Sequence, residues 1–326
     1  MLGPFQNIHG TAHSKPPKLE LTTMVGCPLM CTFCPQDNLR SQYGAARKYM
    51  RVEDLSRVLD KLPKNTIIYF AGMAEPWANP DCTEMLRLVL TRNFKVAIYT
   101  TLYGMKADDA RVVAELLEAH DAQVTTLKLH LPDAKGNMKG WKNTEQWRKA
   151  FTIIRDVKVT CGVETMTMDY SGELHPDAAE LVGAVSNPFA PNTRAGSLDV
   201  SQIGDQKIAP LPRHEKPVMC RYTPVYDKNI LLPNGDVVLC CMDYNRKHVI
   251  GNLLEQDYED LFASQVFLDL VKVNVSAGFS DKSICKSCNM AISLQRANGG
   301  RWRRKLAAGL SSGRRWAAEV GRIARS

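Results

Sequence analysis

The sequence of 326 residues lacks any hydrophobic run near the ~20 apolar residues that a membrane-spanning helix requires. Residues 1–18 are polar and contain Pro and Gly, without the apolar core of a secretory signal peptide. We therefore expect a soluble, cytoplasmic protein with reduced cysteines, which excludes a disulfide framework. No internal repeat is present, and aromatic residues make up only 7% of the chain, a usual share for a globular protein.

The chain outside residues 299–326 has a net charge close to zero. The net charge is +8, but residues 299–326 contain eight Arg or Lys and one acid, Glu319, and so carry +7 of it. Trp302, Leu306 and Leu310 recur there at helical spacing, which predicts a basic amphipathic helix that contacts a membrane surface or a partner. A solvated extension is the alternative. Nucleic acid is not an expected partner, because two tryptophans are too few for a stacking platform.

Cysteine, in contrast, is abundant, with ten in the chain. Cys27, Cys31 and Cys34 form a C-x3-C-x2-C pattern directly after a strand-like run. Three thiolates can bind an iron–sulfur cluster and leave one iron open to a cofactor. Half of a zinc site is the alternative, but structural zinc requires four ligands.

Strand-like and helix-like patterns alternate through the first two-thirds of the chain. Runs rich in Val, Ile and Thr predict strands at 19–25, 66–71, 95–101, 125–131, 157–168 and 198–203. Amphipathic patterns predict helices at 52–62, 82–91, 108–119, 144–154 and 176–185. Six such βα units predict an α/β fold with a parallel sheet.

A second motif follows the second predicted strand. Residues 70–76 read Phe-Ala-Gly-Met-Ala-Glu-Pro and place Gly72 and Glu75 one βα unit after the cysteine loop. Alone, this segment also fits an ordinary turn with a solvated glutamate. Together, the two motifs resemble the radical S-adenosylmethionine (SAM) superfamily, although Ala74 stands where many relatives have glycine. The resemblance implies that SAM chelates the open iron of a [4Fe–4S] cluster bound by Cys27, Cys31 and Cys34.

The same resemblance implies a fold and a set of SAM contacts. Six βα units are too few for a closed eight-fold barrel and fit the open, partial (β/α)6 TIM-like barrel of this superfamily. Catalytic groups are then expected at the carboxyl ends of the strands. The resemblance makes Phe33, Gly72 and Glu75 candidate SAM-binding residues, with Glu75 on the ammonium group. Thr100, at the end of the third predicted strand, is a further candidate for a hydrogen bond to SAM. Arg194 is a candidate for the SAM carboxylate, because a guanidinium group suits a carboxylate geometrically. Loop packing for Phe33 and surface solvation for Arg194 are the alternatives.

The fourth predicted strand contributes two further candidates. Alternation along the strand puts Lys128 and His130 on one face, which points into the cavity of a small barrel. They are candidate catalytic residues that contact substrate or SAM, and histidine can move protons near neutral pH. A purely structural histidine is the alternative.

A second group of cysteines lies near the C-terminus. Cys220 and Cys240 are spaced as C-x14-G-x4-C, and Cys285 and Cys288 form a C-x2-C pair. This resembles the SPASM domain and its shortened "twitch" form, and implies one auxiliary [4Fe–4S] cluster that these four cysteines saturate. An all-cysteine zinc ribbon is the alternative. Cys241 is spare and is expected on the opposite strand face from Cys240, either as a hydrogen-atom donor or as a small buried apolar residue.

We therefore expect four segments: an N-terminal extension (1–18), the barrel (19–205), the auxiliary-cluster α+β domain (206–298) and the basic tail (299–326). The resemblance implies an enzyme that cleaves SAM reductively to a 5′-deoxyadenosyl radical and removes hydrogen from a polar small molecule such as a sugar or cyclitol. A two-electron oxidation is expected, with electrons from a flavodoxin or ferredoxin. The alternatives are a radical epimerase that uses Cys241, a peptide maturase, and a non-enzymatic zinc-ribbon protein.

Overall fold

The protein is built around one open, mostly parallel sheet. The computed structural model describes residues 16–168, 171–182, 192–198 and 211–294. The parallel strands that follow one another are β1 (Lys18–Leu21), β2 (Ile67–Phe70), β3 (Lys95–Thr100), β4 (Val124–Leu131) and β5 (Val163–Thr167). Across the described residues the sheet has the order β5-β4-β3-β2-β1-β7-β8-β9 and does not close on itself. The expected α/β fold with a partial barrel is confirmed.

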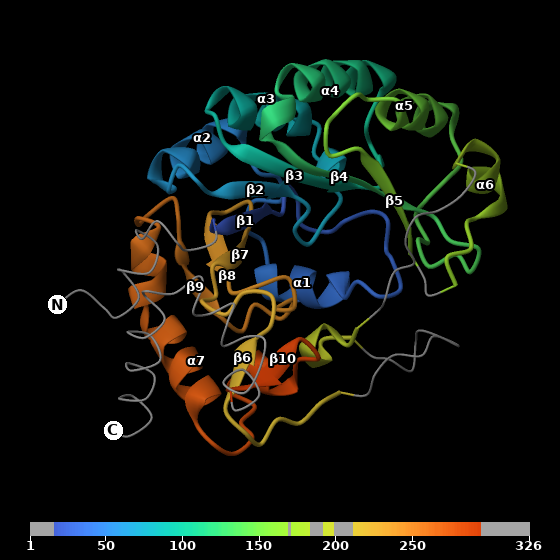
Figure 1. Ribbon diagram of the computed structural model, residues 1–326. Coiled ribbons are helices and arrows are strands. Elements are labelled where there is room, and N and C mark those ends of the chain that lie inside the picture. The colour runs from blue at the N-terminus through green and yellow to red at the C-terminus, as the bar shows by residue number, and fades with distance from the viewer. Residues whose placement is uncertain (1–15, 169–170, 183–191, 199–210, 295–326) are drawn as a thin grey trace.

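Helices cover one face of this sheet. They are α2 (Val52–Lys61), α3 (Cys82–Thr91), α4 (Ala107–Ala119), α5 (Glu145–Arg155) and α6 (Pro176–Val182). In α2, Leu55, Val58 and Leu59 are buried, because apolar residues three and four apart share one helix face. Figure 1 shows α2 to α5 along the convex side of the sheet, while α1 (Gln36–Tyr43) and the C-terminal segments lie on its concave side.

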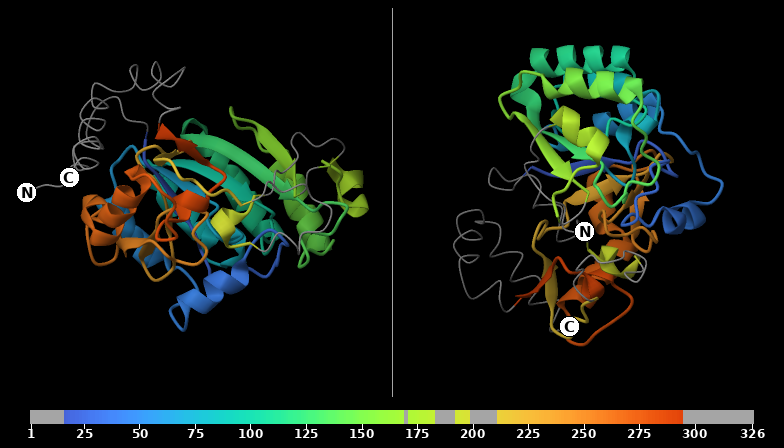
Figure 2. Two further views of the ribbon diagram at one scale, coloured as in Figure 1. Left: turned by 90° about the horizontal axis from the view of Figure 1, so that it is seen from below. Right: turned by 90° about the vertical axis from the view of Figure 1, so that its right-hand side faces the viewer.

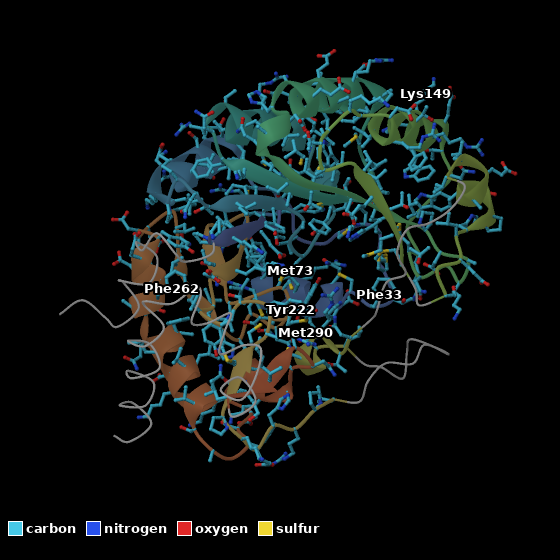
Figure 3. The ribbon with its side chains drawn as sticks, in the orientation of Figure 1. Phe33, Met73, Lys149, Tyr222, Phe262 and Met290 are labelled. Atoms are coloured by element: carbon cyan, nitrogen blue, oxygen red, sulfur yellow. The ribbon has the colours of Figure 1, made fainter. Side chains whose placement is uncertain are left out.

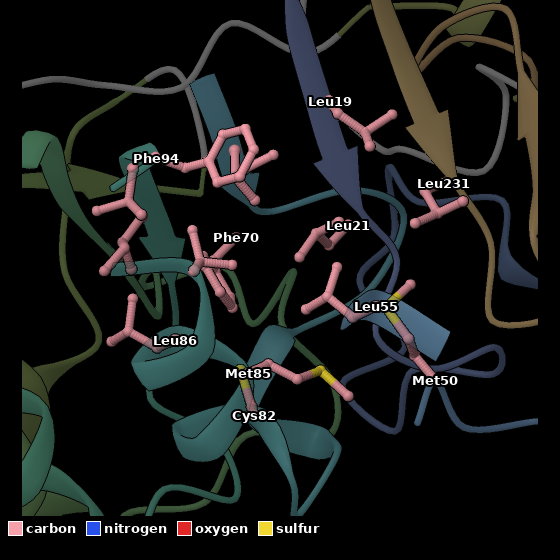
Figure 4. Close-up of a cluster of buried hydrophobic side chains, with 14 of the residues drawn as sticks. Leu19, Leu21, Met50, Leu55, Phe70, Cys82, Met85, Leu86, Phe94 and Leu231 are labelled. Carbon is pink, nitrogen blue, oxygen red and sulfur yellow. The ribbon is translucent and has the colours of Figure 1, made fainter. Parts of the chain in front are cut away.

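The core fills the space between the sheet and these outer helices. Leu19 and Leu21 of β1, Phe70 of β2, Leu55 of α2 and Met85 of α3 are buried and belong to the cluster of side chains that Figure 4 shows. Since strand side chains alternate, the residues between them, such as Glu20 and Tyr69, face the concave side. The sheet therefore separates an apolar layer from a polar interior.

The C-terminal part joins the same sheet. β7 (Lys228–Leu231) pairs in parallel with β1, and β8 (Asp236–Val238) pairs antiparallel with β7 through a hairpin around Asn234-Gly235. The remaining elements are β9 (Val249–Asn252), α7 (Gln265–Val275) and the antiparallel pair β6 (Val218–Cys220) and β10 (Ala291–Ser293). Figure 2 shows this part, in orange and red, against the open side of the barrel.

Some elements differ from the sequence-based expectation. The first strand ends at Leu21, because residues 22–25 leave the sheet to begin the cysteine loop. The fifth strand covers Val163–Thr167, and residues 157–162 form a turn before it. Helix α1 was not expected. The sixth expected strand, at 198–203, lies outside the described residues except for Leu198, as does the tail at 299–326.

Candidate functional site

The cysteine loop lines a cavity at the carboxyl end of the sheet. This cavity, the SAM-side cavity, measures about 150 Å³ and contains all three cysteines of the C-x3-C-x2-C pattern in its wall. Its other predicted site residues are Phe33, Gly72, Glu75, His130 and Arg194. In the part of the chain that the structure describes, no three His, Cys, Asp or Glu side chains form a group that could hold a single metal ion. The three thiols instead share the wall of a larger space.

The loop that follows β4 supports the cysteine loop. Cys31 forms an antiparallel bridge with Met138, and the backbone N–H of Thr32 donates to the carbonyl of Asn137 over 2.9 Å. Gly140 lies so close to this loop that a Cβ atom there would be 2.1 Å from the carbonyl oxygen of Pro28. This contact between the cysteine loop and the loop after β4 was not predicted, because no sequence pattern in either loop indicates that the two meet.

The segment after β2 passes over the end of β1. At Gly72 the φ angle is +62°, and a Cβ atom would lie 2.6 Å from the carbonyl oxygen of Leu21. The next amide, of Met73, donates to Thr22 Oγ1 over 3.0 Å. Only glycine fits this crossing, so Gly72 fixes the path of the segment that presents Glu75.

Glu75 is buried and held by the end of β3. One carboxylate oxygen accepts a hydrogen bond from Thr100 Oγ1, and the other accepts from the amide and hydroxyl of Thr101 at 2.7 and 2.8 Å. Burial raises the pKa of this carboxyl to about 6, although these donors act against the shift. Thr101 lines the SAM-side cavity, whereas Thr100 lies behind Glu75 and positions it.

Two side chains that the sequence analysis missed contact Cys34. Gln36 Nε2 lies 3.2 Å from Cys34 Sγ, and the same side chain accepts from the amide of Cys27. Tyr244 Oη lies 3.2 Å from the same sulfur. Tyr244 comes from the C-terminal part, so no local sequence signal placed it beside a cysteine more than two hundred residues away.

Arg194 connects this corner to the C-terminal part. Its guanidinium lies over the ring of Tyr244, 5.7 Å from the centroid, and its Nε is 3.5 Å from the carbonyl oxygen of Phe33. Arg194 and Ala195 both have φ near +50°, an uncommon conformation for residues with side chains. Thr193, just before them, donates to Asn289 next to Cys288. The strained turn therefore aims Arg194 at the cavity.

The thiols of Cys27 and Cys31 are protonated when no metal is bound. Burial raises the pKa of Cys27 to about 12 and that of Cys31 well above its usual range. Thiols in such surroundings lose their protons when iron takes their place. The donor set and the shared cavity wall thus fit an iron–sulfur cluster bound through Cys27, Cys31 and Cys34.

The inner face of β4 carries the expected pair of residues. His130 lines the SAM-side cavity, and burial, with the positive charges of Lys128 and Arg194, lowers its pKa to about 4. The imidazole is therefore neutral at physiological pH. Lys128 is not among the residues that line this cavity. Its Nζ is 2.8 Å from a carboxylate oxygen of Glu164 and 5.9 Å from the centroid of the Tyr99 ring.

These groups belong to a longer row, the polar strip, which crosses the inner face of the sheet. Its members are Glu20, Tyr69, Tyr99, Lys128, Glu164 and Lys228. Tyr69 and Tyr99 stack at the centre with centroids 6.0 Å apart. At one end Lys128 pairs with Glu164, and at the other Lys228 Nζ lies 2.8 Å from Glu20 Oε1. Tyr99 lines the SAM-side cavity, so the strip continues from it.

The second group of cysteines lines a separate space, the auxiliary cavity, of about 70 Å³. Cys220, Cys240, Cys285 and Cys288 all contribute to its wall. Figure 3 shows Tyr222 and Met290, which also line this cavity, below Phe33 and Met73 of the SAM-side cavity. Four thiols around one space fit the auxiliary cluster that the spacing predicts.

Cys241 lies in the wall of the auxiliary cavity as well. Because β8 ends at Val238, strand alternation alone does not fix how Cys240 and Cys241 are oriented, and their opposite orientation stays a prediction. Burial raises the pKa of the Cys241 thiol, and the charges that act on it include Glu20, Lys228 and Arg194. Cys241 is thus close to the Lys228 end of the polar strip.

Comparison with known proteins agrees with this geometry. The model of the radical SAM superfamily matches residues 21–182. The model of the SPASM iron–sulfur cluster-binding domain matches residues 220–289. The chain belongs to the radical SAM superfamily. A radical SAM protein with a SPASM domain carries a SAM-binding [4Fe–4S] cluster, an auxiliary cluster and SAM, and this family membership makes the chain an enzyme rather than a zinc-ribbon binding protein.

Solved structures of radical SAM proteins resemble this fold at low sequence identity. BtrN in complex with AdoMet and 2-DOIA is 14% identical, with 86% of this chain and 94% of that chain covered and a TM-score of 0.47. Native anSMEcpe with bound AdoMet is 16% identical, covering 84% and 86%, with a TM-score of 0.49. Streptococcus suis SuiB bound to precursor peptide SuiA is 16% identical, covering 84% and 70%, with a TM-score of 0.52. No curated protein matches the chain.

The described residues of this radical SAM enzyme contain no helix that is long and apolar enough to cross a membrane.

Glu75 offers a direct test of the SAM-side cavity. We expect Glu75→Gln to weaken SAM binding about tenfold, because the variant keeps the shape but loses the charge that pairs with an ammonium group. Wild-type affinity should also fall as the pH drops through about 6, where the carboxyl takes up a proton, while the variant stays flat. Calorimetry on the oxygen-free, cluster-loaded protein measures both. Glu84→Gln, on the exposed surface of α3, is the matched control.

Proposed function

We propose that this enzyme oxidises a polar, hydroxyl-bearing small molecule by two electrons. The observation that carries the proposal is the auxiliary cavity, in which Cys220, Cys240, Cys285 and Cys288 share one wall. Four cysteine ligands leave no open iron for substrate, which suits a cluster that accepts an electron. In this reaction the substrate loses two electrons and two hydrogens, one as an atom and one as a proton, and a carbonyl group forms.

The bound cofactors supply the hydrogen-atom abstraction, through a 5′-deoxyadenosyl radical, and the acceptor for the second electron. The protein supplies orientation. Phe33, Gly72, Glu75 and Arg194 line the SAM-side cavity and are the proposed SAM contacts. The imidazole of His130 is the proposed acceptor of the substrate proton, since it lines the same cavity and is uncharged near pH 7.

The polar strip is the proposed substrate surface. Its two stacked tyrosines form an aromatic floor, and the Lys128–Glu164 and Lys228–Glu20 pairs present donors and acceptors at both ends. Such a surface suits a ring with several hydroxyl or amino groups. It also connects the SAM-side cavity, through Tyr99, with the auxiliary cavity, through Lys228.

A peptide substrate is the second candidate. The same strip, with a charged pair at each end, also fits a peptide backbone and its polar side chains. SuiB, which shares the fold, is described as bound to a precursor peptide. Incubating the reduced enzyme with deuterated sugars, aminocyclitols and peptides separates the two candidates. Deuterium in 5′-deoxyadenosine from the small molecules supports our proposal, and deuterium from the peptides alone contradicts it.

Cys241 distinguishes oxidation from epimerisation. If the reaction is an oxidation, Cys241→Ala should keep most of its turnover, because the thiol then only packs in the auxiliary cavity wall. An epimerase would need this thiol to return a hydrogen atom to the substrate radical. Product and 5′-deoxyadenosine are measured together by mass spectrometry. A variant that still cleaves SAM but forms no product would favour the epimerase.

A further inference from the structure

Cys34 differs from the other two cysteines of the loop in having two polar side chains at hydrogen-bond distance from its sulfur. Gln36 Nε2 and Tyr244 Oη both lie 3.2 Å from Sγ. Among the described residues, no side chain lies at hydrogen-bond distance from the sulfur of Cys27 or Cys31, and the donors to Cys27 Sγ are the backbone amides of Glu75 and Leu29. The environment of the three thiols is therefore asymmetric.

The two polar groups are held firmly in place. Gln36 also donates to the carbonyl of Met73 and accepts from the amide of Cys27, so its amide cannot rotate without losing three contacts. Tyr244 is buried in a small apolar cluster with Tyr43, Val25 and Met73. The guanidinium of Arg194 over its ring further restricts its position.

We propose that Tyr244 and Gln36 raise the reduction potential of the SAM-binding cluster by donating hydrogen bonds to the Cys34 sulfur. An iron-bound thiolate has no proton, so the phenol hydroxyl must be the donor when the cluster is present. A donated hydrogen bond withdraws electron density from the sulfur and stabilises the reduced cluster, which has one more negative charge. Tyr244 is thus a positioning residue that reaches the cluster from the C-terminal part of the chain.

The consequence is a coupling between the two parts of the enzyme. The reduction potential of the SAM-binding cluster is raised fully only when the C-terminal part packs against the cysteine loop and places the Tyr244 hydroxyl beside Cys34. The inference rests on the family assignment and on the predicted ligand Cys34, and it is independent of the substrate.

The test is a potentiometric titration of the oxygen-free, cluster-loaded full-length protein, followed by electron paramagnetic resonance. SAM binds only to the cluster that has an open iron, and therefore changes the spectrum of that cluster and not of the other. Spectra with and without SAM thus separate the two clusters. We expect Tyr244→Phe to shift the midpoint potential of that cluster to a more negative value, and Gln36→Leu to shift it in the same direction. Tyr43→Phe is the matched control. Tyr43 lies in the same apolar group of side chains as Tyr244, but its hydroxyl donates to the carbonyl of Arg47 and not to Cys34.

Iron and sulfide analysis accompanies each titration. A Tyr244→Phe protein with wild-type iron and an unchanged or more positive midpoint potential overturns the proposal. Loss of the cluster in that variant also overturns it, because Tyr244 would then hold the loop together rather than tune a bound cluster. An equal negative shift in Tyr43→Phe would show that any hydroxyl in this region has the same effect on the midpoint potential, and would also overturn the proposal.

Discussion

Replacing Cys27, Cys31 and Cys34 together with alanine is expected to abolish SAM cleavage and to leave the auxiliary cluster in place. The three thiols line only the SAM-side cavity, and the other four ligand candidates line only the auxiliary cavity. Iron content after oxygen-free reconstitution should fall by about half, since each [4Fe–4S] cluster holds the same amount. Formation of 5′-deoxyadenosine should fall to the background rate.

The matched control is Cys161→Ala, because Cys161 lies in the turn before β5 and lines neither cavity. It should keep both the iron content and the SAM cleavage of the wild type. Replacing Cys220, Cys240, Cys285 and Cys288 instead should remove the other half of the iron. A triple variant of the loop that retains all its iron, or that still forms 5′-deoxyadenosine, would refute the proposed ligand set.

Gly72→Ala is expected to have the second largest effect, although it adds only a methyl group. The new Cβ atom would lie 2.6 Å from the carbonyl oxygen of Leu21, the last residue of β1, and 2.7 Å from Oγ1 of Thr22, which follows it. The positive φ angle adds its own cost, so we expect a loss of about 3 kcal/mol in the free energy of unfolding. SAM binding should fall further, because the displaced segment carries Glu75.

Gly44→Ala separates the two costs. Gly44 also has a positive φ angle, +66°, but a Cβ atom there meets no atom within 4 Å. Gly44 has a ψ angle of −143°, a combination that is almost restricted to glycine, so this variant should lose about 2 kcal/mol from the backbone conformation alone and bind SAM normally. Denaturant unfolding and calorimetry compare the two variants. Equal losses in both would show that the close approach at Gly72 is not what requires glycine.

The sequence predicted most of the fold because each signal was local. Five of the six expected strands lie in the described residues and are present there as β1 to β5. Periodicity and turn residues act within a few positions along the chain, so they can be interpreted without knowledge of tertiary contacts. Helix α1 was missed because its eight residues are mostly polar and bury only Gln36, Leu39 and Tyr43.

The candidate site was predictable where it depends on spacing. The two cysteine patterns, the Gly72–Glu75 segment and the alternation of Lys128 and His130 all follow from positions in the chain, and the structure places the cysteines around two cavities. The opposite orientation of the adjacent residues Cys240 and Cys241 stays a prediction, because β8 ends at Val238, before either residue.

By itself, then, the sequence determined the superfamily, the parallel sheet and the two sets of cysteines, since these are encoded in residue types at short separations. Only the tertiary structure decided that Tyr244 and Gln36 meet at Cys34, that the loop after β4 supports the cysteine loop, and that β7 joins the sheet beside β1. Those contacts join segments up to about two hundred residues apart, and they depend on how the whole sheet assembles. No pattern within either segment specifies its partner, because packing against distant elements creates the contact.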